Sequence, residues 1–174
     1  MFSMRADDVV SLGLVERRHT AALDTLWQDN GDRLREWEPW ASEDGALDDP
    51  SGWVRYCLDR FAQGSAVFTF VLRDDEPVGT VGLWLGRDRS VATIDYFVDR
   101  KHEGDGLVTR AVGRMVEYAL EEREVEVVEI GPAATNTRAR AVPERLGFEL
   151  VEVERGTLKF PEHHADRALY RLTR

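Results

Sequence analysis

Two glycines at the junction between a β-rich run and a helical segment constrain the fold of this chain more than any other feature. The run is Val91–Val98, the glycines are Gly104 and Gly106, and apolar residues then recur at helical spacing from Leu107 to Ala119. Glycine lets a backbone approach a ligand closely, and a helix N-terminus presents unpaired N–H groups to an anion. The junction therefore predicts a cradle for an anion such as pyrophosphate, with a loop that only requires positive φ angles as the alternative.

The remaining patterns predict a mixed α/β (α+β) fold built on a central sheet. Three β-rich runs follow one another with polar turns between them, which predicts an antiparallel meander. Asp49 and Pro50 are typical of a helix start, and we expect the first helix to end at Gly31 and the last at Gly147. The predicted order is β-α-α-β-β-β-α-β-α-β-β, with seven mostly antiparallel strands at 9–15, 66–72, 78–85, 91–98, 125–130, 148–158 and 166–172 and four helices at 20–30, 50–63, 107–119 and 136–146.

Size and composition limit the classes of protein that the chain can belong to. Its 174 residues suffice for one domain, 1–174, and the net charge of −10 argues against a nucleic-acid partner. No apolar run is long enough for a membrane span, and residues 1–10 do not have the pattern of a signal peptide, so we expect a cytoplasmic protein without a membrane partner. Of the 23 basic residues only Lys101 and Lys159 are lysines, which favours a halophile-like protein, with a GC-rich genome as the alternative. Cys57, the only cysteine, is expected to be a buried structural thiol.

Four segments of the chain resemble the RimJ/RimL branch of the GNAT superfamily of acetyltransferases. They are Ile94-Asp-Tyr-Phe-Val98, Glu103-Gly-Asp-Gly-Leu-Val-Thr109, Asn136–Phe148 and Asp166-Arg-Ala-Leu-Tyr170. The resemblance implies the GNAT fold and an acetyl-CoA-dependent N-acetyltransferase, in which a primary amine attacks the thioester directly and no metal takes part. It also implies a protein N-terminal α-amine, such as that of a ribosomal protein, as the acceptor. The alternative functions are acetylation of a small amine, such as an antibiotic or a polyamine, and a noncatalytic acyl-CoA-binding regulatory module. As for oligomeric state, a homodimer is compatible with the sequence.

The resemblance assigns one set of residues to acetyl-CoA. Backbone groups of Phe97 and Val98 are expected to bind the pantetheine arm and the thioester. Asn136 matches an asparagine that contacts the cofactor in relatives, and it also suits the N-cap of the following helix. Asp105 stands where relatives usually carry lysine or arginine, which would place a negative charge beside the phosphates. The loop amides expected to hold the pyrophosphate are those of His102, Glu103, Gly104, Asp105, Gly106, Leu107 and Val108.

The sequence offers two carboxylates as the candidate general base. Many relatives carry a glutamate at the position of Thr93 and a glycine at that of Asp95. Because alternate residues of a strand share a face, Asp95 could supply the missing carboxylate, with a solvated or ion-paired surface aspartate as the alternative. Glu38 is the next carboxylate to consider.

The same resemblance leaves two further roles open. Ala139 and Pro143 stand where other branches carry a serine and a tyrosine that protonate the departing thiolate, so ordered water is left to carry that proton. Trp37 and Trp40 lie in an aromatic and acidic cluster, in a region that usually shapes the acceptor pocket. They are candidate substrate-binding residues, with filling of the core or of a lid as the alternative.

Overall fold

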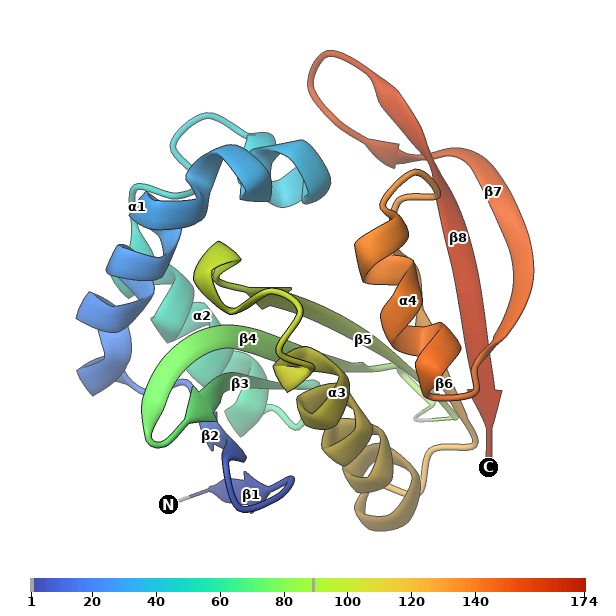
Figure 1. Ribbon diagram of the computed structural model, residues 1–174, viewed down its shortest axis with the longest axis horizontal. Helices are drawn as coiled ribbons and strands as arrows, with labels where there is room; N and C mark the ends of the chain where they lie inside the picture. The colour runs from blue at the N-terminus through green and yellow to red at the C-terminus, as the bar shows by residue number, and fades with distance from the viewer. Residues whose placement is uncertain (1, 89) are drawn as a thin grey trace.

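The structure is a computed structural model that describes residues 2–88 and 90–174, and its framework is one sheet. In this part of the chain the sheet has eight strands in the order β1-β2-β3-β4-β5-β6-β8-β7 (Figure 1). Neighbouring strands are antiparallel except β5 and β6, which are parallel. The strands are β1 (Ser3–Arg5), β2 (Val10–Leu14), β3 (Ala66–Arg73), β4 (Glu76–Leu85), β5 (Val91–Val98), β6 (Val127–Ile130), β7 (Glu149–Lys159) and β8 (His164–Thr173).

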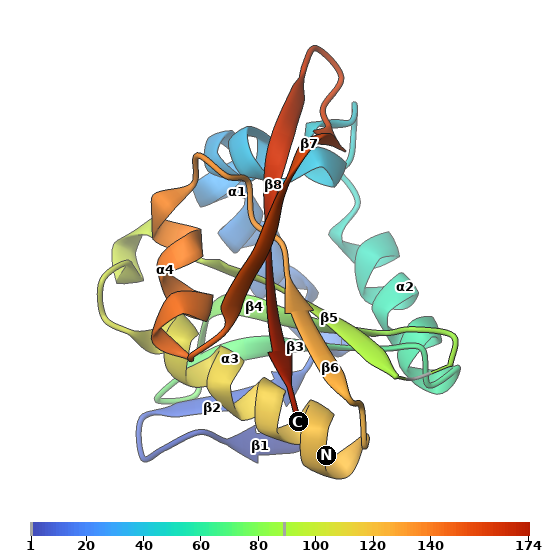
Figure 2. The same cartoon turned by 90° about the vertical axis from the view of Figure 1, so that its right-hand side faces the viewer.

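Helices cover both faces of the sheet, and strand β3 shows why both faces are apolar. Successive residues of a strand point to opposite faces. Phe68 and Phe70 accordingly belong to the apolar core under α1 and α2, whereas Val67 and Val71 belong to the core under α3 (Figure 2). The helices are α1 (Thr20–Trp37), α2 (Pro50–Ala62), α3 (Leu107–Glu117) and α4 (Thr137–Arg145), with short helical turns η1 (Arg17–His19), η2 (Pro39–Ser42), η3 (Arg100–His102) and η4 (Tyr118–Glu122).

The sheet opens between its two parallel strands. β5 pairs with β4 from Ala92 to Val98, which is all of the strand except its first residue. It pairs with β6 only at Val91, Ala92 and Thr93. Beyond Thr93 the other edge of β5 therefore has no strand partner among the described residues, and its backbone groups are available to a ligand.

Two sequence-based predictions about the fold need correction. A three-residue strand, β1, pairs with β2 and brings the strand count to eight; it is too short to show a periodic pattern. The first helix does not end at Gly31 but continues to Trp37, with Gly31 buried inside it. Glycine costs a helix only about 1 kcal/mol, and the burial of Leu34 in the next turn outweighs that cost.

Other expectations are confirmed. Asp49 caps α2 by accepting a hydrogen bond from the backbone of Gly52, and Gly147 ends the last helix with a φ of 79°. Cys57 is buried, and burial raises the pKa of its thiol. Among the described residues no helix is long and apolar enough to cross a membrane.

Candidate active site

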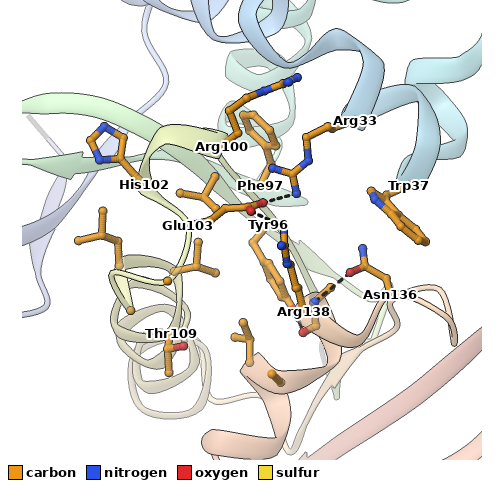
Figure 3. A pocket seen from close by; sticks show the side chains of 18 of the residues that line it. Arg33, Trp37, Tyr96, Phe97, Arg100, His102, Glu103, Thr109, Asn136 and Arg138 are labelled. Carbon is orange, nitrogen blue, oxygen red and sulfur yellow. Dashed lines mark hydrogen bonds and ion pairs between the residues drawn. The ribbon is translucent and has the colours of Figure 1, made fainter.

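The larger of two neighbouring cavities is a cleft of about 1020 Å³ at the point where the sheet opens (Figure 3). Its walls come from the end of β5, the loop that follows, and the facing parts of α1, α3 and α4. Nearly all the residues that the sequence assigned to acetyl-CoA line it. These are Phe97, Val98, His102, Glu103, Gly104, Gly106, Leu107, Val108 and Asn136.

The glycine loop has the geometry of an anion cradle. Gly104 and Gly106 have φ angles of +85° and +70°, which only glycine adopts readily, and a Cβ at either position would meet nothing within 4 Å. The need for glycine is therefore conformational, as the alternative interpretation held, yet both residues also line the cleft. Gly106 is the N-cap of α3 and has no side chain to cap it, so the first-turn N–H groups are free for a ligand.

Arginines from three elements face this loop, but internal carboxylates already pair with several of them. Figure 3 shows Arg33 of α1 and Arg138 of α4 converging on Glu103, with Arg138 at 2.5 Å. Arg110 pairs with Asp7 at 2.8 Å. Arg145 lines the cleft at the end of α4 without an ion pair among the described residues.

Asp105 is the one predicted coenzyme-binding residue that does not line the cleft. Its carboxylate accepts a hydrogen bond from Arg73 of β3 at 2.8 Å and lies 3.9 Å from His102. Neither Asp105 nor Arg73 lines the cleft. The negative charge expected beside the phosphates is thus turned toward β3, and only the main chain of Asp105 stays a candidate for coenzyme contact.

Asn136 combines the two roles considered for it. Its side-chain oxygen accepts a hydrogen bond from the backbone N–H of Ala139 at 3.0 Å, so it caps α4, and it also lines the cleft. Tyr96, which the sequence did not single out, donates a hydrogen bond to the carbonyl of Ala139 at 2.7 Å and thereby joins β5 to α4. Arg33 was also missed, because nothing in the pattern of α1 marks which of its charged residues faces the cleft.

The second cavity is an aromatic pocket of about 300 Å³ on the α1 and α2 side of β5. It meets the cleft at Leu34, Glu38, Tyr96 and Phe97, which line both. Glu38 and Asp95, the two candidate catalytic carboxylates, both line this pocket. Trp40 lines it as well, whereas Trp37 lines the cleft. Its other aromatic residues are Trp27, Trp53, Tyr56, Phe68 and Trp84.

Asp95 is held in this pocket by its neighbours on β4. Its carboxylate accepts a hydrogen bond from the indole N–H of Trp84 at 2.7 Å and another from the backbone of Gly82. Gly82 lies directly opposite Asp95 in the sheet, where a Cβ would come within 2.3 Å of the carboxylate. Glycine is required at this position so that the Asp95 side chain can lie across β4.

The surroundings of the two carboxylates alter their proton affinities. Asp95 is open to water through the pocket, but protein surrounds it on the other sides. The resulting desolvation raises the pKa of Asp95, and the hydrogen bonds from Trp84 and Gly82 offset part of that rise. Burial, and then the charge of Asp95, raise the pKa of Glu38 to about 8. Glu38 also accepts a hydrogen bond, from Trp40, which lowers its pKa in part, but the repulsion between the two carboxylates acts on Glu38, so Asp95 is the member of the pair that ionises first. At neutral pH Glu38 retains its proton.

The sequence matches the family described as acetyltransferase (GNAT) domain over residues 12–149. It is 29% identical to a Bacillus subtilis protein named "Putative ribosomal N-acetyltransferase YdaF" over 178 residues, which cover 99% of this chain and 95% of YdaF. RimL, a ribosomal L7/L12 α-N-protein acetyltransferase solved in complex with coenzyme A, superposes with a TM-score of 0.93 at 16% identity, over 99% of this chain and 98% of RimL. The microcin C7 self-immunity acetyltransferase MccE, solved with acetyl-CoA and AMP, gives 0.91 at 17% identity, over 98% and 96%.

The two superpositions show a shared fold, and the family match covers most of the chain, including β5, the glycine loop and α4. The chain belongs to the GNAT family of acetyltransferases.

Proposed function

We propose that the chain transfers the acetyl group of acetyl-CoA to a primary amine and that the acceptor is a protein N-terminal α-amine. The observation that carries the proposal is that the cleft and the aromatic pocket meet at Glu38, Tyr96 and Phe97. A coenzyme in the cleft and an amine in the pocket would bring their reactive ends together there. The names of YdaF, "Putative ribosomal N-acetyltransferase", and of RimL, a ribosomal L7/L12 α-N-protein acetyltransferase, support a protein acceptor.

The cleft suits the coenzyme because its parts match successive groups of that molecule. The first-turn N–H groups of α3 and the glycine loop suit the pyrophosphate, and Arg145 supplies a cation for a phosphate. The unpaired edge of β5 at Phe97 and Val98 suits the amide groups of the pantetheine arm. These assignments lead the thioester to the mouth of the aromatic pocket.

The proposed reaction uses Asp95 as the base. The acceptor arrives as an ammonium ion, gives a proton to the Asp95 carboxylate, and its nitrogen then attacks the thioester carbon. The backbone N–H of Phe97 or Val98 donates a hydrogen bond to the oxyanion of the tetrahedral intermediate. As the carbon–sulfur bond breaks to give the amide, the nitrogen gives up its second proton, which an ordered water passes to the departing thiolate to form the free thiol, and the proton on Asp95 returns to solvent.

A small-molecule acceptor is the second candidate, and one observation favours it. The aromatic pocket, at about 300 Å³, has the size of a site for a small ligand. MccE, solved with AMP, has the same fold. A peptide N-terminus also fits if only its first residue enters the pocket and the rest of the peptide lies outside.

A panel of acceptors decides between these candidates. The purified chain is given acetyl-CoA and either peptides with a free α-amine, the same peptides blocked at the N-terminus but carrying one lysine, or small amines such as spermidine. Thiol release and product mass are followed, with the chain and acetyl-CoA alone as the blank. We expect acetylation of the free α-amines. Turnover confined to the small amines contradicts the protein acceptor, and coenzyme binding without thiol release from any amine contradicts the reaction itself.

A further inference from the structure

We infer that the aromatic pocket recognises the acceptor as a cation and rejects any acceptor that carries a carboxylate beside its amine. The inference rests on the proposed function, since it takes the pocket as the place of the acceptor amine. It goes further because it states which amines are accepted and which are excluded. Free amino acids fall in the excluded class, and peptide N-termini that begin with an uncharged residue fall in the accepted one.

The walls of the pocket are suited to a positive charge. The rings of Trp84 and Phe68 are 4.8 Å apart and perpendicular, Phe68 and Trp53 are 5.6 Å apart, and Trp53 and Trp27 are 5.7 Å apart. Trp40 continues this series at 5.8 Å from Trp27. Ring faces attract cations, and tryptophan does so most strongly. A continuous wall of four tryptophans and a phenylalanine thus favours an ammonium group over a neutral one.

The packed rings also fix the shape of the pocket. Each ring is held by an edge-on or tilted contact with the next, which leaves little freedom for rearrangement. Tyr56 closes the series near Phe68 and Trp84, and Arg60 already lies over the Tyr56 ring at 4.9 Å. Arg60 lies on the same helix as Tyr56 and outside the pocket lining, so this ring already has a cation partner on the outside of the pocket.

At neutral pH the described residues that line the pocket carry one charge, that of the Asp95 carboxylate. Asp95 and Glu38 are its ionisable carboxyl groups, and no arginine, lysine or histidine lines it among the described residues. The cleft next to it has Arg33, Arg138 and Arg145 in its walls. A carboxylate brought into the pocket beside the amine would find Asp95 and no cation, whereas an ammonium would find both a carboxylate and ring faces.

This difference leads to a rule for acceptors. In a free amino acid the carboxylate is separated from the amine by one carbon, so both must enter the pocket together. In a peptide the same carboxyl group is an amide and carries no charge. The pocket should then accept leucine amide and refuse leucine, although the two differ only in that charged group.

The first arm of the test measures binding without acetyl-CoA. Choline, its neutral isostere 3,3-dimethylbutanol and the anion butanoate are titrated against tryptophan fluorescence. We expect choline to bind at least tenfold more tightly than dimethylbutanol, and butanoate not to bind. Asp95→Asn should weaken choline binding at least tenfold. The matched control, Asp59→Asn, removes the same charge from an exposed position on α2 outside the pocket and should leave it unchanged.

The second arm measures turnover with acetyl-CoA. We expect kcat/KM for leucine amide to exceed that for leucine at least 100-fold. We also expect kcat/KM for a peptide that begins with Leu to exceed that for a peptide that begins with Asp. Equal binding of choline and dimethylbutanol, no binding of either, or equal turnover of leucine and its amide would each overturn the inference. Selective choline binding by a protein that acetylates no amine would support the cation pocket while contradicting the proposed function, so the two failures are distinct.

Discussion

The cleft and the aromatic pocket share Tyr96 and Phe97, but they differ in what surrounds a ligand. The cleft offers backbone groups of a loop and a helix N-terminus, together with arginines that are partly neutralised by carboxylates of the protein itself. The pocket offers rigid rings and two carboxyl groups, with no cation among the described residues. The two halves of the proposed reaction therefore depend on different parts of the chain, so a substitution can damage one half and spare the other.

The largest effect is expected at Asp95. Replacing it with asparagine keeps the size of the side chain and its place beside Trp84 but removes the base, so kcat should fall about 100-fold while acetyl-CoA affinity stays near its original value. Steady-state kinetics and calorimetric titration of the coenzyme measure the two quantities. A variant with full kcat at neutral pH would remove Asp95 from the mechanism, and Glu38 would then be the carboxylate to test.

A substitution in the glycine loop should weaken coenzyme binding and leave the aromatic pocket intact. Gly106→Val forces a β-branched residue into a φ of +70° and should weaken acetyl-CoA binding at least tenfold, or about 1.4 kcal/mol, while choline binding in the aromatic pocket is unaffected. Gly106→Asn is the matched control, because asparagine tolerates this conformation, and it should stay within about threefold of the original affinity. Unchanged affinity in a folded Gly106→Val protein would show that the loop does not hold the coenzyme.

Glu38 should make the stability of the protein depend on pH. Its pKa is raised from 4.5 to about 8 in the folded state, so between these values the folded protein binds more protons than the unfolded chain. The free energy of unfolding contributed by this group therefore falls as pH rises through that window, by at most about 1.4 kcal/mol per pH unit. Denaturant titrations at several pH values should show a shallower fall for Glu38→Gln. Glu36→Gln, on the exposed face of α1, is the control, and equal slopes for the two variants would contradict the shift.

A smaller effect is expected where Glu103 binds the cleft arginines. Glu103→Gln removes a negative charge from the coenzyme site and releases Arg33 and Arg138, so acetyl-CoA should bind about threefold to tenfold more tightly. Calorimetric titration measures the change. Weaker binding would mean that Glu103 positions these arginines for the phosphates and does not compete with them.

The smallest effect is expected at Asp105, the other acid of the same loop. Its carboxylate is paired with Arg73 away from the cleft, so Asp105→Asn should change acetyl-CoA affinity by less than about twofold. The same titration serves as the measurement. A large gain in affinity would mean that the Asp105 charge acts on the phosphates after all.

The order of the elements could be predicted from the sequence because the signals for it are local. Apolar spacing in α3, the proline at the start of α2 and the glycine after α4 each report on a few neighbouring residues, and the elements formed where they indicated. The same holds for the glycine loop and for the cap at Asn136. The short β1 and the continuation of α1 through Gly31 were missed because pairing with a distant strand and burial of Leu34 decided them.

How these elements act together depends on contacts between residues that are far apart along the chain. The sequence placed Asp95 on a strand and left Glu38 between two predicted helices. Their shared pocket depends on the packing of α1 and α2 against β3 and β4, and their pKa values depend on that burial. The direction of the Asp105 side chain depended in the same way on Arg73 of β3. Periodicity and glycine content are properties of neighbours along the chain. Desolvation, ring packing and charge pairing are properties of neighbours in space, and they follow only from the fold.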